Sequence, residues 1–376
     1  MDANPPARWQ PGKAVMMKHL VYVGTYTQTT PAAPHRREGI FVYGMDTLEG
    51  GLTLLSAAES GPNPSFLAFH PKRPFLYAVN ELAEGGVSAF AINQASGELT
   101  RLNHQPTHGS APCHLTCDPT GKWLLVANYG SGNLTVLPIL PDGQIAPPTD
   151  LIQHRSLDEG ARDAHAHSVT FDPGELFVLA ADLGIDRILV YALDGKSGRL
   201  LPNHPPGVKA TYGAGPRHLA FHPNARVLYA ANELNSTVTA YSCDGEKGLL
   251  APIQTLSTLP KDFAGVNSVA DIHLNAAGKF LYVSNRGHDS LAIFAADEQA
   301  GTLEPMGHIS SGGQCPRNFA LDPSGLFLLA ANQNSNNLVI FRIQADTGQL
   351  TPTAQSVSIP QPVCVKIIEL SSLKEE

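Results

Sequence analysis

The sequence predicts an all-β protein, a seven-bladed β-propeller built from four-stranded antiparallel blades. The first observation is a repeated spacing, in which a turn-like His, Asp or Asn is followed ten residues later by Asn or Asp. The second members of the pairs lie 47 to 54 residues apart, with several short apolar segments between them. A repeat of that length, with several strands in each copy, is typical of propeller blades. The six pairs are His70/Asn80, Asp118/Asn128, Asp172/Asp182, His222/Asn232, Asn275/Asn285 and Asp322/Asn332.

One copy of the repeat, which begins at Pro216, shows the four expected strands of a blade. RHLAFHP is a short apolar strand that ends in a His-Pro turn, and VLYAANE and STVTAYS are the second and third strands. GLLAPIQTL follows a Gly-containing turn and is the fourth strand. Full copies begin near Pro64, Pro112, Ala166, Pro216, Val269 and Pro316, which gives six blades.

The two ends of the chain predict the seventh blade. HLVYVGTYT, GIFVYGM and GLTLLSAAE match strands two to four, and QPVCVKIIEL near the other end matches an isolated first strand. Pairing of the two ends would close the ring and leave no exposed sheet edge. If these strands do not pair, six blades is the alternative. We expect one propeller domain over residues 18–370, a disordered leader at 1–17 and a tail at 371–376.

The composition indicates a soluble, cytoplasmic protein. The net charge is −8, which gives no reason to expect a nucleic acid or an anionic membrane as partner. No apolar run approaches the roughly 20 residues that span a bilayer. None of the five cysteines forms a C-x-x-C pair, which favours reduced thiols in the cytoplasm. We expect a monomer or a weak homodimer.

Two sets of side chains are expected at one end of the central channel. In a regular hairpin about residue 225, Arg217 at the start of the first strand lies opposite Glu233 at the end of the second. The same two positions can be read in every blade. The first set is Ser65, Cys113, His167, Arg217, Ala270, Arg317 and Val363. The second set is Tyr26, Glu81, Tyr129, Leu183, Glu233, Arg286 and Gln333.

The basic members of these sets point to an anion-binding catalytic site. Arginines that converge in a funnel bind phosphate or carboxylate well, because the guanidinium fork matches those oxygens. A carboxylate or imidazole beside them can move a proton from water. The alternatives are a purely structural ion pair of Arg217 with Glu233, and a histidine that only holds a loop. The members concerned are His167, Arg217, Arg286 and Arg317, with Glu233 among them.

The sequence gives no sign of a metal or an organic cofactor. His165 and His167 form a His-x-His pair, but no third ligand accompanies it at a diagnostic spacing. A G-x-S-x-G elbow, a P-loop and an H-E-x-x-H motif are all absent, so a nucleophilic serine is not expected. We therefore expect cofactor-free chemistry.

Several longer segments resemble the lactonase family of seven-bladed propellers. They are DAHAHSVTFDP, GPRHLAFHPN, YAANELNSTV, SNRGHDSLAIF and CPRNFALDPSGLFLLAANQNSNN, and the resemblance covers about residues 18 to 370. This family includes the bacterial propeller-type 6-phosphogluconolactonases and the fungal carboxy-muconate lactonizing enzymes. In the muconate-type enzymes a His, an Arg, a Glu and a second Arg are associated with the active site. By motif these fall on His167, Arg217, Glu233 and Arg286, with His165 as the alternative histidine.

The resemblance implies a hydrolase of carbohydrate metabolism, a 6-phosphogluconolactonase of the pentose phosphate pathway, whose partner is a small phosphorylated sugar lactone. We expect Arg286 and Arg317 to bind the phosphate and Arg217 to stabilise the oxyanion. Glu233 or His167 would take the proton of the attacking water. His165, Tyr129 and Gln333 are expected to line the substrate. The alternatives are a cycloisomerase or lactonase that acts on a muconate-like or other lactone, a ligand-binding propeller without activity, and a protein-interaction scaffold.

Overall fold

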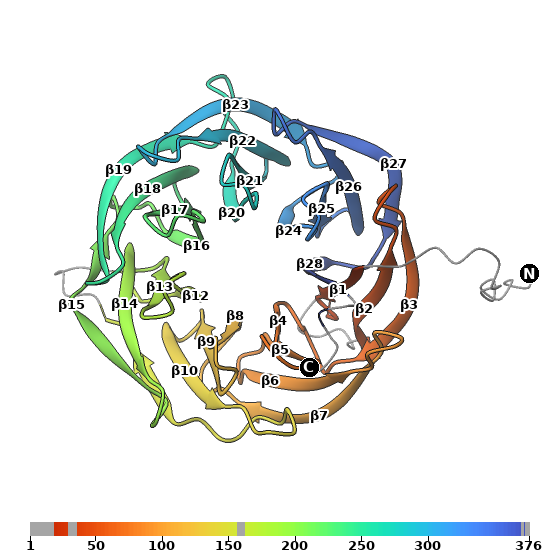
Figure 1. Cartoon of the computed structure of the whole chain (residues 1–376), viewed down its shortest axis with the longest axis vertical. Helices are drawn as coiled ribbons and strands as arrows, with labels where there is room; N and C mark the ends of the chain where they lie inside the picture. Colours follow the sequence, from red (N-terminus) through yellow and green to blue (C-terminus); the bar gives the residue numbers. More distant parts are fainter. Residues whose placement is uncertain (1–18, 29–35, 156–161, 370–371, 373–376) are drawn as a thin grey trace, which may run out of the picture.

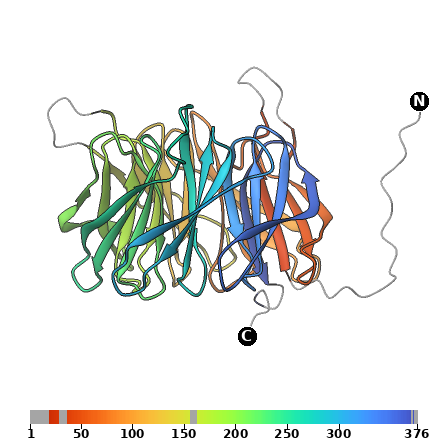
Figure 2. The same ribbon diagram turned by 90° about the horizontal axis from the view of Figure 1, so that it is seen from above.

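Seven sheets stand around a central axis and form a closed ring (Figure 1). In this computed structural model the described residues are 19–28, 36–155, 162–369 and 372. They form 28 strands in seven four-stranded antiparallel sheets. Seen from its side, the ring is a disc whose thickness is about the length of the inner strands (Figure 2). The predicted fold, an all-β seven-bladed propeller, is confirmed.

Six blades run in chain order from the innermost strand to the outermost. Blade 1 contains β4 (Leu67–Phe69), β5 (Phe75–Asn80), β6 (Gly86–Ile92) and β7 (Leu99–Pro106). Blade 2 contains β8 (Pro112–Cys117), β9 (Trp123–Asn128), β10 (Asn133–Pro138) and β11 (Asp150–Gln153). Blade 3 contains β12 (Ala166–Phe171), β13 (Val178–Asp182), β14 (Arg187–Asp194) and β15 (Arg199–Lys209).

The next three blades repeat this order. Blade 4 contains β16 (Pro216–Phe221), β17 (Val227–Asn232), β18 (Thr237–Asp244) and β19 (Leu249–Ser257). Blade 5 contains β20 (Ser268–Leu274), β21 (Phe280–Arg286), β22 (Ser290–Ala296) and β23 (Leu303–Ser310). Blade 6 contains β24 (Pro316–Leu321), β25 (Phe327–Asn332), β26 (Asn337–Ile343) and β27 (Leu350–Ser358).

Blade 7 is assembled from both ends of the described chain. Its order is β28 (Pro362–Glu369), β1 (His19–Thr25), β2 (Glu38–Met45) and β3 (Leu52–Glu59). β28 pairs antiparallel with β1, so that Val23 lies opposite Val365. The predicted closure is confirmed, and the alternative of six blades is wrong. The predicted leader, 1–17, lies outside the described residues, as do residues 371 and 373–376 of the predicted tail.

The repeated turn residues hold the hairpins between the first and second strands. Asp322 accepts the backbone N–H of Phe327 on Oδ1 at 2.7 Å. In the equivalent turn of blade 4, His222 Nδ1 accepts the N–H of Asn224, and Nε2 donates to the carbonyl of Gly278 in blade 5. The repeated residue therefore closes its own turn and, in the histidine version, also ties two blades together.

The repeated asparagines hold the next turn. Asn232 Nδ2 donates to the hydroxyls of Thr237 and Thr239, both at 2.9 Å. Asn128 makes the same kind of contact with Thr135 at 3.0 Å. These amides pair the end of a second strand with the start of the third, which explains why the residue recurs in most blades.

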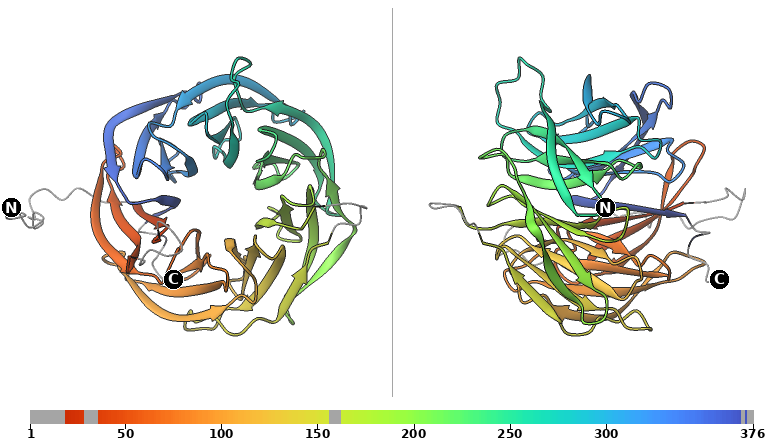
Figure 3. Two further views of the ribbon diagram at one scale, coloured as in Figure 1. Left: turned by 180° about the vertical axis from the view of Figure 1, so that it is seen from behind. Right: turned by 60° about the vertical axis from the view of Figure 1, so that its left-hand side comes forward.

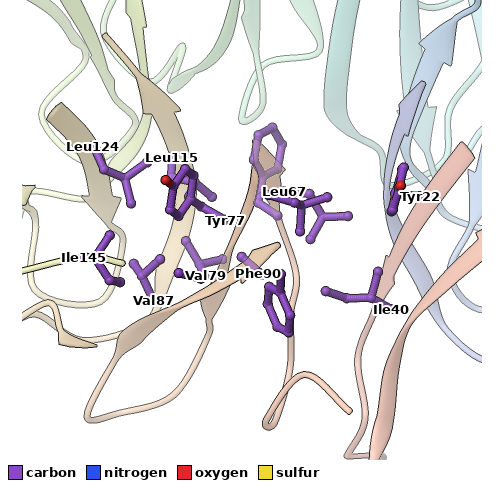
Figure 4. Close-up of a cluster of buried hydrophobic side chains, with 14 of the residues drawn as sticks. Tyr22, Ile40, Leu67, Tyr77, Val79, Val87, Phe90, Leu115, Leu124 and Ile145 are labelled. Carbon is purple, nitrogen blue, oxygen red and sulfur yellow. The ribbon is translucent and has the colours of Figure 1, made fainter. Parts of the chain in front are cut away.

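The apolar core lies between neighbouring sheets. In the cluster shown in Figure 4, Tyr22 and Ile40 of blade 7 pack with Leu67 and Phe90 of blade 1, and the cluster continues to Leu124 of blade 2. All five side chains are fully buried. Burial of one such aliphatic or aromatic side chain is worth about 1.5–3 kcal/mol. Each blade is thus stabilised mainly by the sheets on either side of it.

The innermost strands carry β-bulges that the sequence did not predict. In β16, Pro216 pairs with Asn232 and His218 with Ala231, so Arg217 has no residue opposite it. The expected pairing of Arg217 with Glu233 across a regular hairpin is wrong. The same shift skips Cys113, His167 and Arg317 in their strands. A bulge inserts one residue and redirects its side chain, which is why such bulges often occur beside active sites.

The turn glycines offer a test of the contacts between blades. Gly278 has a φ of +74°, and a Cβ there would lie 2.5 Å from Nε2 of His222. Gly325 occupies the same turn position in blade 6, with a φ of +72° and open space around it. We expect G325A to cost about 1–2 kcal/mol from backbone strain alone. We expect G278A to cost at least about 1 kcal/mol more, because of the clash with His222.

Urea denaturation of the two variants beside the wild type measures the difference. Equal losses in G278A and G325A would mean that the His222 contact does not constrain this turn.

Candidate active site

The candidate site lies at one end of the ring. The innermost strand of each blade faces the central axis, as the views from the two faces of the disc show (Figures 1 and 3). These strands are β4, β8, β12, β16, β20, β24 and β28. First and second strands are antiparallel, so the start of one and the end of the other share a face. We call this face the channel mouth, defined by Tyr26, Glu81, Tyr129, His167, Arg217, Glu233, Arg286 and Arg317.

Arg217 and Arg286 share one carboxylate oxygen of Glu233. Arg217 Nε lies 2.8 Å from Oε2, and Arg286 Nη2 lies 2.9 Å from the same atom. Arg217 comes from the bulge of blade 4, Glu233 follows the second strand of that blade, and Arg286 ends β21 of blade 5. The ion pair that the sequence offered as a structural alternative is therefore present, but it includes a second arginine.

The charges in this cluster shift each other's pKa. Burial alone would raise the pKa of Glu233, but Arg217 and Arg286 outweigh burial and lower it, so the carboxylate is ionised at neutral pH. Burial, followed by the charge of Arg286, lowers the pKa of Arg217 to about 10, which still leaves it protonated.

The Nε groups of both arginines are buried and form no hydrogen bond within the described residues. The Nε–H of Arg217 does not point at Glu233 closely enough for a hydrogen bond, and the buried Nε of Arg286 also has no hydrogen-bond partner within the described residues. Two guanidinium groups also carry more charge than the single carboxylate of Glu233 neutralises, which suits the cluster to an incoming anion.

Arg317 forms a second cluster that spans the closure of the ring. Its Nη2 lies 4.0 Å from Glu81 Oε1 of blade 1, and its guanidinium lies over the ring of Tyr26, 5.3 Å from the centroid. The Tyr26 hydroxyl donates to Glu81 at 2.9 Å. Burial would lower the pKa of Arg317, but Tyr26 and Glu81 raise it overall. The sequence put Tyr26 and Glu81 among the second set of positions but did not assign them to the site.

The two histidines of the His-x-His pair have different surroundings. His165 donates from Nδ1 to the carbonyl of Tyr129 at 2.9 Å, and its ring stacks on that tyrosine at 4.6 Å. His167 is buried, meets the ring of Tyr129 edge-on at 5.5 Å, and has Nδ1 3.8 Å from Cys113 Sγ. Burial and the nearby Arg217 hold the pKa of His167 well below its usual range, so the ring is neutral at pH 7 and can accept a proton.

Within the described residues, Gln333, a predicted substrate-binding residue, contacts Cys315 and not the histidines, Tyr129 or the charged groups of the mouth. Its backbone N–H donates to the carbonyl of Cys315, and its side-chain oxygen lies 3.9 Å from the sulfur of the same residue. Among the hydrogen bonds and ion pairs of the described residues, none joins Gln333 to the arginines.

A small cavity of about 70 Å³ lies among the innermost strands, next to the residues of the mouth. His114, His218, Asp271 and Lys366 are among the side chains that line it. In the described part of the chain, no group of three or more His, Cys, Asp or Glu is arranged to hold a metal ion. The same residues contain no helix with the length and apolar character needed to cross a membrane.

Comparison with known proteins decides the family. The sequence profile described as "Lactonase, 7-bladed beta-propeller" matches residues 20–367. The chain belongs to this lactonase family. It is 37% identical to a 6-phosphogluconolactonase of Bacillus subtilis (strain 168) over 94% of its own length and 99% of that protein. The family assignment confirms the prediction of a lactone hydrolase.

Solved structures in the family have the same architecture. A putative 6-phosphogluconolactonase from Bacteroides fragilis superposes with a TM-score of 0.85 at 34% identity, over 96% of this chain and all of that one. A periplasmic gluconolactonase from Pseudomonas aeruginosa gives a TM-score of 0.86 at 33% identity, over 93% of this chain and 99% of that one.

The buried histidines predict a loss of stability in acid. In the folded protein, burial and Arg217 lower the pKa of His218 to about 4, and that of His167 lies well below its usual value. In the unfolded chain both have a pKa of about 6.5. Their contribution is therefore complete above pH 6.5 and is lost as the pH falls toward the folded pKa, by up to about 1.4 kcal/mol per pH unit for each histidine.

Urea unfolding between pH 7.5 and 4.5 measures this slope. H167Q should show a shallower pH dependence than the wild type, whereas H108N, at an exposed histidine, should follow the wild type. The same slope in all three proteins would show that His167 is not buried in its neutral form.

Proposed function

We propose that this lactonase-family enzyme hydrolyses 6-phosphogluconolactone to 6-phosphogluconate, a step of the pentose phosphate pathway. The observation that carries the proposal is the convergence of Arg217, Arg286 and Arg317 on one mouth, where Glu233 and Glu81 offset only part of their charge. A local excess of positive charge suits an anionic lactone. The near end-to-end match to the 6-phosphogluconolactonase of Bacillus subtilis supports the same substrate.

In the proposed complex Arg286 and Arg317 bind the phosphate. Their side chains are 15% and 19% exposed, whereas that of Arg217 is 3% exposed. The two outer guanidinium groups are thus accessible to the charged end of a substrate that enters from solvent. Arg217 lies deeper, where it would meet the lactone ring.

The chemical step is attack of water on the lactone carbonyl. As the oxygen of water bonds to the carbonyl carbon, negative charge moves to the carbonyl oxygen, and Arg217 stabilises it. Collapse of the tetrahedral intermediate breaks the bond between that carbon and the ring oxygen. The ring oxygen takes a proton and becomes a hydroxyl group, and the product is the open-chain carboxylic acid.

We propose His167 as the general base that accepts the proton of the attacking water. Its neutral ring can accept a proton, and bound phosphate and oxyanion would offset the arginines that make it a weak base in the free enzyme. Glu233 is less suited, because its Oε2 already contacts two arginines and they lower its pKa. Glu233 then keeps Arg217 and Arg286 together. Tyr129 packs edge-on against His167, and His165 stacks on Tyr129.

An unphosphorylated sugar lactone is the second candidate substrate. The relative from Pseudomonas aeruginosa, a periplasmic gluconolactonase, supports it. We favour the phosphorylated substrate because of the three arginines at the mouth. We favour a cytoplasmic location because all five cysteines are unpaired, as expected in a reducing compartment.

Removal of Arg217 should abolish most of the activity. We expect R217A to lower kcat/KM for freshly generated 6-phosphogluconolactone by about 10²–10³-fold, as loss of one oxyanion donor does in other enzymes. The assay couples the product to 6-phosphogluconate dehydrogenase and subtracts spontaneous hydrolysis. R37A is the control, because Arg37 is 80% exposed and its ion pair among the described residues is with the exposed Glu59. A wild-type rate in R217A would remove this residue from the mechanism.

The phosphate contact separates the two candidate substrates. R286A should lower kcat/KM for 6-phosphogluconolactone by about 10-fold or more, since a charged hydrogen bond is worth about 1.5–3 kcal/mol. For glucono-δ-lactone the same change should have a much smaller effect. If the wild type prefers glucono-δ-lactone and R286A affects both lactones equally, the unphosphorylated substrate is the correct one.

A further inference from the structure

Asp271 is a buried carboxylate next to the mouth whose two oxygens accept five N–H groups. It lies in the bulge of β20 and is 2% exposed. Oδ1 accepts from His218 Nδ1 at 2.7 Å and from the backbone of Ile272 at 3.0 Å. Oδ2 accepts from His273, from the side chain of Asn318 and from the backbone of Phe319. The two histidines and these hydrogen bonds outweigh burial and hold the pKa of Asp271 well below its usual range.

These contacts join the innermost strands of four consecutive blades. His218 belongs to β16, Asp271 to β20 and Asn318 to β24. Asn318 Oδ1 in turn accepts the backbone N–H of Val365 in β28, at 2.6 Å. One carboxylate thus links the inner strands on the side of the channel that carries all three arginines.

Two of the three arginines of the mouth lie one residue away from this network. Arg217 directly precedes His218, and Arg317 directly precedes Asn318. Both arginines are bulge residues with no pairing partner opposite them. Their backbone positions therefore depend on the neighbour that Asp271 holds.

The peptide group between Ala270 and Asp271 adds a direct contact. Its carbonyl accepts from Arg217 Nη1, and its N–H donates to Ser284 Oγ at 2.9 Å. The preceding carbonyl, of Val269, accepts from Arg286 Nη2 at 3.2 Å. The bulge that Asp271 fixes is therefore also the backbone platform on which two guanidinium groups rest.

From this geometry we propose that Asp271 is the positioning residue of the three-arginine site. It sets the spacing of Arg217, Arg286 and Arg317 without touching the substrate. The proposal rests on the proposed function, because it treats the arginines as the substrate-binding groups. A misplacement of about 1 Å in such a site can cost about 10²-fold in rate, so the spacing has a measurable effect.

The first experiment compares D271N with D118N. The side-chain NH2 group of an asparagine at position 271 would face N–H donors, such as those of His218 and Asn318, that the carboxylate of Asp271 now accepts. Asp118 is a matched control, because it is 3% exposed and accepts the N–H groups of Lys122 and Trp123 in a hairpin turn at the other end of the inner strands. At a temperature at which both variants are folded by circular dichroism, D271N should lower kcat/KM at least about 10-fold. D118N should lower only the unfolding midpoint.

Two further variants, S284A and the double variant R217A/D271N, separate a positioning role of Asp271 from general destabilisation. S284A removes the acceptor of the Asp271 N–H without a change of charge, and should lower kcat/KM in the same direction as D271N. In the R217A background, D271N should have a smaller effect than in the wild type, because only Arg286 and Arg317 remain to be misplaced and residues that act as a unit are not additive. An equal effect in both backgrounds, or an equal loss in D118N, would overturn the proposal.

Binding of inorganic phosphate distinguishes failure of this proposal from failure of the proposed function. If the wild type does not hydrolyse 6-phosphogluconolactone, the proposed function is wrong. The positioning role is then judged by calorimetry with phosphate, which should bind several-fold more weakly to D271N than to the wild type or D118N. Equal affinities in the three proteins, or no phosphate binding to the wild type, would overturn the positioning role.

Discussion

The pairing of β28 with β1 is the constraint on which the rest of the structure depends. A propeller blade is stabilised by the sheets on both sides of it, so an unpaired blade would leave two apolar sheet faces exposed. Here Val21 and Val23 of β1 pack with Leu329 and Ile340 of blade 6, and Tyr22 of the same strand packs toward blade 1. The alternation of side chains along one strand thus seals the ring on both sides.

The closure also determines the chemistry of the mouth. Arg317 comes from blade 6, Tyr26 from blade 7 and Glu81 from blade 1, so their contacts cross the place where the chain ends meet. On the other side, Arg217, Glu233 and Arg286 come from two adjacent blades. The site is therefore a property of the closed ring, because no single blade contains more than two of these charged groups.

The sequence was sufficient for the blade count, the strand order and the set of residues at the mouth, because each depends on a local, repeated pattern. It was not sufficient for the pairing of Arg217. A hairpin drawn from its turn has regular register, and nothing in the residues around Pro216 marks the bulge. The contact of Arg317 with Glu81 could not be predicted either, since it joins residues far apart in the chain. Asp271 was overlooked because its partners His218 and Asn318 lie 53 and 47 residues away.

The incomplete neutralisation of the arginines by Glu233 and Glu81 affects how an anionic substrate reaches the site. Three arginines and two glutamates give the mouth a net charge of +1, whereas the whole chain carries −8. An approaching anion is repelled at long range and attracted only within about one Debye length, roughly 8–10 Å at physiological salt. Moderate salt weakens the distant repulsion before it weakens the close attraction. The encounter rate should therefore pass through a maximum as the ionic strength rises.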